Sequence, residues 1–219
     1  SMHTDGAEIA LEQLRDTHDA GIVATGLSAD NPLPVDGADA PGVYGAGHIA
    51  RLLNADADEH RTVTHLPSLG ATTTVVGNGN VAMDMIRLLA STEHHLAASD
   101  IDQPTHATLT AELTTINVLG RSAVSAAKFD PVMLREIANL EGINHTVTGF
   151  DPKTAPDDAR TRLVAELASR QPVAAPRVTI NWYFGATPHR VTASDTGVEA
   201  VTVATGTGTI QLPTTSVIT

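Results

Sequence analysis

Cysteine is absent from the 219 residues of this chain. Its absence excludes disulfides, thiolate zinc sites and cysteine nucleophiles, so any redox chemistry requires a bound cofactor. No apolar run approaches the roughly 20 residues that cross a bilayer, and we expect no membrane partner. The opening residues, SMHTDGAEIALEQL, lack the basic and then apolar pattern of a secretory signal peptide. A cytoplasmic location is therefore expected.

Basic residues are also scarce. The chain has 13 Lys and Arg against 25 Asp and Glu, a net charge of -12, and no basic run. This balance argues against a nucleic-acid partner. Three arginines on one predicted helix, Arg160, Arg162 and Arg170, could form a local basic patch for an acidic protein partner. A merely solvated helical face explains them equally well.

Strand and helix patterns alternate through the middle of the chain. Residues 72–76, 114–120 and 143–150 are predicted strands, and residues 81–91 and 131–142 are predicted helices. Asp130 followed by Pro131 is a typical helix start, and Asp157 or Asp158 caps a further helix. Four strand-like runs then follow from residue 176 to residue 213, which we interpret as an antiparallel arrangement. The predicted fold is α/β, a Rossmann-like three-layer domain with a central parallel sheet and an antiparallel β flap.

A glycine-rich turn, TTTVVGNGNVAMD, joins the first of these strands to its helix. Gly77 allows a tight turn, Gly79 allows close approach of a pyrophosphate, and Ala82 packs helix on strand. The amides at the helix start would face the phosphates. A purely structural strand-to-helix turn is the alternative. The predicted cofactor-binding residues in this turn are Gly77, Asn78, Gly79, Asn80, Val81 and Ala82.

The dinucleotide fingerprint usually places an acidic residue about 20 positions on, at the end of the second strand. Asp100 and Asp102 lie near that count, but their surroundings are not those of a strand end. The second strand is TINVL, and the position that closes it belongs to Arg121. A guanidinium suits the 2′-phosphate of NADP(H). NADP(H) is therefore favoured over NAD(H), with a simply solvated arginine as the alternative.

Four motifs together resemble the adrenodoxin-reductase-like ferredoxin–NADP reductases, flavoproteins with an FAD-binding and an NADP-binding domain. They are VVGNGNVAMDMIRLL, SDI, LGRSAVSAAKFDPVMLREI and FGATP, and DAGIVATG extends the likeness towards the start. The resemblance implies an NADP-binding domain over residues 71–219. Residues 1–70 would hold a partial flavin-lobe strand at IVATG, residues 22–26, and a connecting segment.

The chain departs from the family pattern at several positions. The family has Gly-Arg-Arg after its second strand and a Glu in the next helix; here Arg121 is kept, Ser122 replaces the second arginine, and Met133 stands where that Glu would be. The resemblance thus implies a weakened NADP(H) preference at Arg121 and Ser122. Glu136 matches a second family carboxylate near the nicotinamide and is carried over as a catalytic candidate, although a solvated helical face is the stronger explanation.

The FAD-binding glycine turn and the Gly-Trp segment of the family do not occur in this sequence. We therefore expect FAD in the full-length protein only, and a colourless isolated chain. Ser1 and Met2 look like a remnant of tag cleavage, and the sequence stops in a strand-like run, so we expect an excised domain. His94, His95 and His106 lack metal-ligand spacing, and no metal is expected.

The resemblance implies an electron-transfer oxidoreductase. NADPH would pass a hydride to FAD, which would send electrons to a ferredoxin-type iron–sulfur protein; the isolated domain would bind nucleotide without turnover. One alternative is a non-catalytic dinucleotide-binding sensor module. Another is the NADPH-oxidising subunit domain of a glutamate-synthase-type flavoenzyme, which would be accompanied by cysteine clusters. The oligomeric state is left open.

Overall fold

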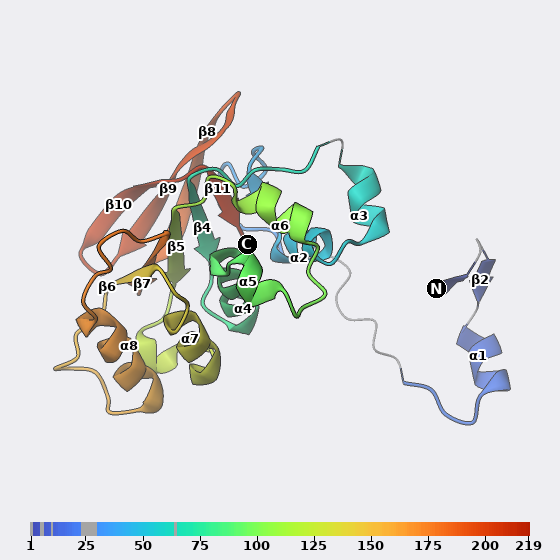
Figure 1. Cartoon of the computed structure of the whole chain (residues 1–219), viewed down its shortest axis with the longest axis horizontal. Coiled ribbons are helices and arrows are strands. Elements are labelled where there is room, and N and C mark those ends of the chain that lie inside the picture. The colour runs from blue at the N-terminus through green and yellow to red at the C-terminus, as the bar shows by residue number, and fades with distance from the viewer. Residues whose placement is uncertain (1, 5–6, 10, 23–29, 64) are drawn as a thin grey trace.

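A computed structural model describes residues 2–4, 7–9, 11–22, 30–63 and 65–219. Figure 1 shows the elements in chain order. They are β1 (Met2–Thr4), β2 (Ala7–Ile9), α1 (Leu11–Thr17), β3 (Val43–Tyr44), α2 (Ala46–Leu53), α3 (Ala57–Thr62), β4 (Thr72–Val76), α4 (Asn80–Ala90), α5 (Glu93–Leu96), α6 (Gln103–Thr110), β5 (Thr115–Gly120), the 3-10 helix η1 (Val124–Ala126), α7 (Pro131–Ala138), β6 (Ile143–Thr148), α8 (Ala159–Ser169), β7 (Val178–Phe184), β8 (Thr187–Ser194), β9 (Gly197–Thr205), β10 (Gly208–Pro213) and β11 (Ser216–Ile218).

A six-stranded parallel sheet forms the centre of the molecule, in the order β3-β11-β4-β5-β7-β6. Its inner strands are rich in β-branched residues and bury both faces, as parallel strands covered on each side do. Along β5, Ile116 and Val118 pack into one core, whereas Leu119 packs into the other. The period of two along the strand therefore divides its side chains between two layers.

Helices cover one face of this sheet. The larger core joins apolar side chains of α2, α4, α7 and α8 to the strands, with Trp182 of β7 and Phe129 among its large buried residues. Asp130 caps α7 with Pro131 at its first position, and Asp158 caps α8 in a capping box. These local signals end the connecting loops and set where each helix begins.

A separate three-stranded antiparallel sheet, in the order β10-β9-β8, covers the other face (Figure 1). Val191, Val201 and Val203 of this flap pack against Leu119 and Val217 of the central sheet. The molecule therefore has three layers: helices, parallel sheet and antiparallel flap. This confirms the predicted Rossmann-like fold class with its β flap.

Polar side chains cross the central sheet beneath the flap. Asn181 Nδ2 donates to Asn117 Oδ1 at 2.9 Å, and Thr146 Oγ1 donates to Asn181 Oδ1 at 2.7 Å. Asn117 Nδ2 donates to Thr74 Oγ1 at 3.4 Å, and Thr74 Oγ1 donates to Thr214 at 2.9 Å. Since Thr74, Asn117, Asn181 and Thr146 are directly opposite one another, this chain of hydrogen bonds specifies the register of four strands.

One prediction about strand direction is wrong. The run around β7 was expected to be antiparallel, yet β7 lies between β5 and β6 and is parallel to both. Its alternating buried residues, Val178, Ile180, Trp182 and Phe184, satisfy either arrangement, and only its partners decide the direction. The final strand-like run, β11, inserts between β3 and β4.

The domain boundary predicted at residue 71 stays a prediction. β3 joins the central sheet, and Ile49, Leu52 and Leu53 of α2 are fully buried in the same core as α4. Val43 and the residues after it therefore contribute to one packed unit. The expected flavin-lobe strand at residues 22–26 falls, apart from exposed Ile22, outside the described residues, and its assignment stays a prediction. No helix in the described part of the chain is long and apolar enough to cross a membrane.

Candidate functional site

A groove of about 470 Å³ opens where the carboxyl ends of β4, β5 and β7 meet. Ligands of open α/β sheets bind at this edge. The lining residues come from four segments that are distant in sequence: Leu33, Pro34, Val35, Val76, Gly77, Asn78, Gly79, Leu119, Arg121, Ser122, Lys128, Ala186, Thr187 and Pro188. The structure thus brings the glycine turn together with Arg121 and Ser122.

The glycine turn presents open backbone to the groove. Gly77 has a φ of 116°, a conformation that favours glycine, and its N–H donates to Leu119 O at 2.8 Å. A Cβ built on Gly77 or Gly79 would meet no heavy atom within 4 Å. Nothing in the described part of the chain therefore fills the space in front of this turn.

The N-cap residue of helix α4 is Gly79, so no N-cap side chain bonds the first amides of this helix. Every other helix from α3 to α8 has one, from Asp56, Thr92, Asp102, Asp130 and Asp158 respectively. The first amides of α4 therefore have no capping carboxylate or hydroxyl among the described residues. Together with the helix dipole, such amides form an anion-binding position.

Asn78 lines the groove, but its side-chain donor is buried. Its Nδ2 is buried and has no hydrogen-bond partner among the described residues. The amide group packs against Gly120, where a Cβ would lie 2.2 Å from Nδ2. A buried donor without an acceptor costs free energy, and a side chain at Gly120 would collide with this amide.

The end of β5 is held in place by the chain that follows β7. The N–H of Gly185 donates to Ser122 O at 3.1 Å, and the N–H of Ala186 donates to Gly120 O at 2.9 Å. These bonds leave the Arg121 side chain exposed at the groove, where it makes no hydrogen bond or ion pair with any described residue. A guanidinium so placed can bind an anionic oxygen.

The remaining wall comes from the loop at residues 33–35. Leu33 and Val35 pack against the flap core, and the Asp36 carbonyl accepts the N–H of Val191 at 2.8 Å. The sequence does not mark this segment as part of the site, because nothing local to it indicates what it contacts. Lys128 was also missed, although it follows Arg121 by seven positions and is one of only two lysines in the chain.

Several predicted residues lie outside the groove lining. Asn80 Oδ1 accepts the N–H of Asp130 at 2.9 Å and so joins the starts of α4 and α7. Val81 is 70% exposed, and Ala82 is buried in the core. Glu136 lies on the exposed face of α7, away from the groove lining, and its catalytic role stays a prediction. Asp102, which was considered as the acidic residue of the dinucleotide fingerprint, caps α6.

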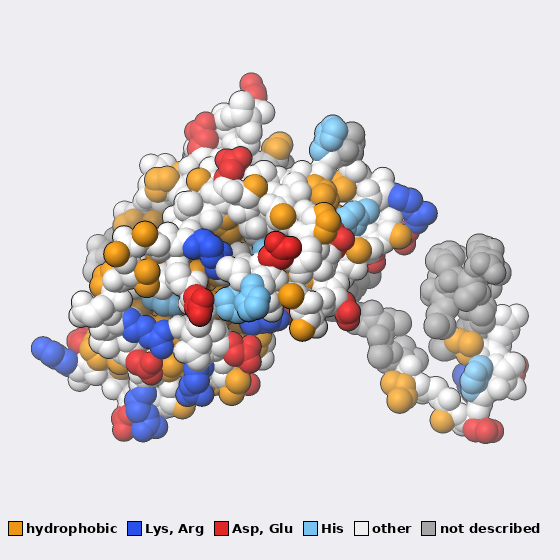
Figure 2. Space-filling model, in the orientation of Figure 1, with side chains coloured by type: hydrophobic (Ala, Val, Ile, Leu, Met, Phe, Trp, Pro, Cys, Tyr) orange, Lys and Arg blue, Asp and Glu red, His pale blue; other side chains and the backbone are white. Residues whose placement is uncertain are grey.

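The arginines of α8 are engaged in local contacts. Arg162 lies 3.4 Å from Asp157, and Arg170 pairs with Glu166 at 2.9 Å. Arg160 donates to Phe129 O at 3.1 Å and stacks on that ring. Figure 2 shows basic side chains interspersed with acidic ones over the region of α7 and α8, the pattern of a solvated face.

The histidines considered for metal binding make separate contacts. His106 Nε2 lies 2.9 Å from Leu88 O, and His95 Nδ1 lies 2.7 Å from Thr92 Oγ1. Within the residues described by the structure, no group of three His, Asp or Glu side chains is arranged to hold a metal ion.

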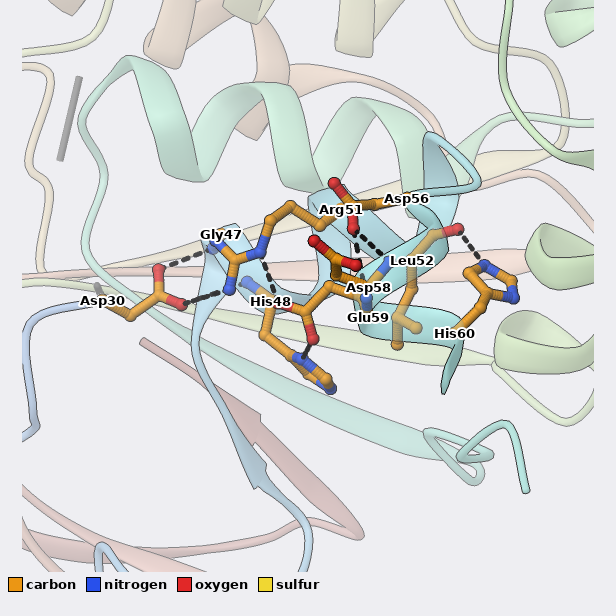
Figure 3. Close-up of polar contacts among 9 residues, drawn as sticks. All are labelled: Asp30, Gly47, His48, Arg51, Leu52, Asp56, Asp58, Glu59 and His60. Carbon is orange, nitrogen blue, oxygen red and sulfur yellow. Dashed lines mark hydrogen bonds and ion pairs between the residues drawn. The ribbon is translucent and has the colours of Figure 1, made fainter. Parts of the chain in front are cut away.

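A second polar cluster surrounds the start of α2 (Figure 3). The Asp30 carboxylate accepts the N–H groups of Gly47 and His48 at 2.7 and 3.0 Å. Glu59 of α3 accepts from Arg51 and from His48 Nδ1, the latter at 2.8 Å. The hydrogen bond from Arg51, with a further contribution from His48, holds the pKa of Glu59 below its usual value.

Known proteins resemble this chain in both sequence and structure. It is 39% identical over 195 residues to cindoxin reductase of Citrobacter braakii, which covers 88% of the chain and 42% of that relative. It is 31% identical over 140 residues to the NADPH-ferredoxin reductase FprA of Mycobacterium leprae, which covers 64% of the chain and 30% of that relative. No protein-family model matches the chain.

The structure of Mycobacterium tuberculosis FprA in complex with NADPH superposes with a TM-score of 0.79 and 25% identity, over 96% of this chain and 51% of that one. The chain thus spans about half the length of these relatives or less. The sequence identity, the three-layer fold and the motifs that line the groove all indicate the same family. The chain belongs to the adrenodoxin-reductase-like ferredoxin–NADP reductase family.

Proposed function

We propose that this chain binds NADP(H), and that it is the NADP-binding domain of a flavin-dependent ferredoxin–NADP reductase. The observation that carries the proposal is the uncapped start of α4 in the same groove as Arg121 and Ser122. The pyrophosphate would lie on the turn at Gly77, Asn78 and Gly79. The 2′-phosphate would lie at Arg121 and Ser122.

The chemistry of the groove fits such a ligand. Its lining supplies open backbone amides and two cationic side chains, and no lining residue is Asp or Glu. This concentration of donors contrasts with a chain whose net charge is -12. A dinucleotide phosphate would bring the acceptors and the negative charge that these donors lack.

In the intact protein, bound NADPH would supply a hydride to FAD, and the electrons would pass to a ferredoxin-type iron–sulfur protein. This chain's part is to bind and orient the nucleotide. We propose that FAD binds the remainder of the intact protein, that residues 1–70 hold a partial flavin-lobe strand and a connecting segment, and that the protein works in the cytoplasm. A non-catalytic sensor or a glutamate-synthase-type subunit would use the same groove.

Calorimetric titration with NADP⁺ and NAD⁺ tests the nucleotide. We expect NADP⁺ to bind more tightly, and Arg121→Gln to lower NADP⁺ affinity about tenfold with little change for NAD⁺. Arg135→Gln, an exposed arginine of α7 away from the groove, is the matched control. Equal affinities that Arg121→Gln does not alter would rule out the 2′-phosphate position. If the purified chain shows flavin absorbance, the chain itself binds FAD, and the proposal that FAD binds only in the intact protein is wrong.

A further inference from the structure

We infer that Lys128 is a second cationic group for the 2′-phosphate and a determinant of the preference for NADP(H) over NAD(H). The inference rests on the proposed function, because it concerns the same groove. Among the described residues, Arg121 and Lys128 are the cations that line the groove. Ser122, which stands where the family has its second arginine, can donate to a phosphate but carries no charge.

The chain between the two cations is folded back on itself. After Ser122 it forms η1, and the N–H of Ala127 donates to Val124 O at 3.1 Å, which closes the turn. The turn returns Lys128 to the groove that Arg121 lines, although seven positions separate the two residues. The second cation is therefore supplied by a turn rather than by the adjacent position.

The backbone of Lys128 is anchored on its C-terminal side. Phe129 is fully buried, and its carbonyl accepts Arg160 Nε at 3.1 Å. The Lys128 side chain itself is exposed and makes no hydrogen bond or ion pair with a described residue. A fixed backbone with a side chain that has no other partner suits a group that reaches a bound phosphate as a point charge.

The local electrostatics favour the same role. The basic side chains of α8 contact acids, a carbonyl or an aromatic ring, whereas neither Arg121 nor Lys128 is neutralised by a described side chain. Two cations that line one groove make it locally electropositive, which favours a bound anion. A 2′-phosphate, with close to two negative charges, matches this pair. The bare ribose of NAD(H) offers neither group an anionic partner.

The test compares NADP⁺ and NAD⁺ affinities of this chain and its variants by calorimetry. We expect Lys128→Gln to lower NADP⁺ affinity about three- to tenfold and to change NAD⁺ affinity less than about twofold. Lys128→Arg should retain the preference. The matched control is Lys153→Gln, because Lys153 is the other lysine and lies exposed outside the groove.

Salt and a double variant provide further readouts. The loss caused by Lys128→Gln should shrink at about 1 M salt, where the screening length is about 3 Å. Arg121→Gln with Lys128→Gln should bring the two affinities within about twofold of each other. If Lys128→Gln leaves the NADP⁺ to NAD⁺ ratio unchanged while Arg121→Gln lowers it, the inference is wrong and the proposed function stands. If the unmodified chain binds neither nucleotide, the proposed function itself fails.

Discussion

Helices α2 and α4 contribute to the same core. Each has an N-cap glycine in extended conformation, Gly45 for α2 and Gly79 for α4. At α2 the carboxylate of Asp30 accepts the N–H groups of Gly47 and His48. At α4 no described side chain caps the first amides. One helix start is thus satisfied by an anion from its own chain, and the other is open to a groove.

The two N-cap glycines sharpen this comparison. A Cβ on Gly45 would lie 2.2 Å from Asp30 Oδ2, so glycine is required there because a carboxylate comes close. A Cβ on Gly79 would meet nothing within 4 Å. The start of α2 shows, within one molecule, the approach that a phosphate would make at α4. Substitutions at the two helix starts can break or sharpen this parallel.

The largest effect is expected when a carboxylate is introduced at the start of α4, as Asp30 already provides one at the start of α2. Gly79→Asp should lower dinucleotide affinity at least about 100-fold, because the carboxylate would bond the amides and repel the phosphates. The backbone at Gly79 is extended and accepts any residue, so thermal stability should be retained or rise. Calorimetry and thermal unfolding measure the two effects. Unchanged affinity would contradict the placement of the pyrophosphate.

The same small substitution at the two N-cap glycines should have opposite consequences. Gly45→Ala should lower the free energy of unfolding by about 1–3 kcal/mol, because its Cβ would overlap the Asp30 carboxylate. Gly79→Ala should change it by less than about 0.5 kcal/mol and weaken dinucleotide binding instead. Urea unfolding and calorimetry separate these outcomes. Equal losses of stability at both positions would show that the glycines do not differ as proposed.

Removing the internal anion should cost somewhat less. Asp30→Ala deletes the cap of α2, and we expect the free energy of unfolding to fall by about 1–2 kcal/mol. Dinucleotide binding should be unaffected, since Asp30 does not line the groove. Asp58→Ala is the control: Asp58 pairs with Arg61 in an exposed ion pair, and its loss should matter little. In the Asp30→Ala background, Gly45→Ala should cost less because the Asp30 carboxylate is gone, but a loss should remain because Asp30 Cβ lies 2.5 Å from the new Cβ; a double-mutant cycle would measure this coupling.

The smallest effect concerns acid titration of the α2–α3 cluster. The pKa of Glu59 is lowered in the folded protein, chiefly by Arg51, so its stabilisation is present above the unfolded pKa and is lost as the pH falls through the folded pKa. The free energy of unfolding should therefore decline from about pH 5 to about pH 3, and Glu59→Gln should make this decline shallower. Urea unfolding across this range is the measurement. Parallel profiles would mean that the cluster does not depend on the Glu59 charge.

Local patterns predicted much of the fold. The β-branched run of β4, the glycine turn and the start of α4 follow from strand propensity, backbone freedom and periodicity, which neighbouring residues determine. Asp130 with Pro131, and Asp158, mark helix starts for the same reason. Within the groove, Gly77, Asn78, Gly79, Arg121 and Ser122 were all predicted, because each follows the carboxyl end of a predicted parallel strand.

The rest depends on contacts between segments that the sequence does not pair. The direction of β7 follows from its hydrogen bonds to β5 and β6, and its alternation of buried residues would suit an antiparallel partner equally well. The wall at residues 33–35 depends on the packing of a loop against the flap. Lys128 has no periodicity or spacing that marks it as a groove residue; the η1 turn brings it there.

The sequence by itself determined the parallel α/β core, the open glycine turn and the arginine after the second strand, because turns, caps and strand ends are properties of a few consecutive residues. The tertiary structure decided which helix start is capped by a carboxylate of the same chain. Asp30 reaches α2 across 17 positions, whereas α4 opens onto a groove completed by Lys128 and a distant loop. Packing between remote segments makes this difference, which separates a helix capped by its own chain from one whose first amides open onto a groove.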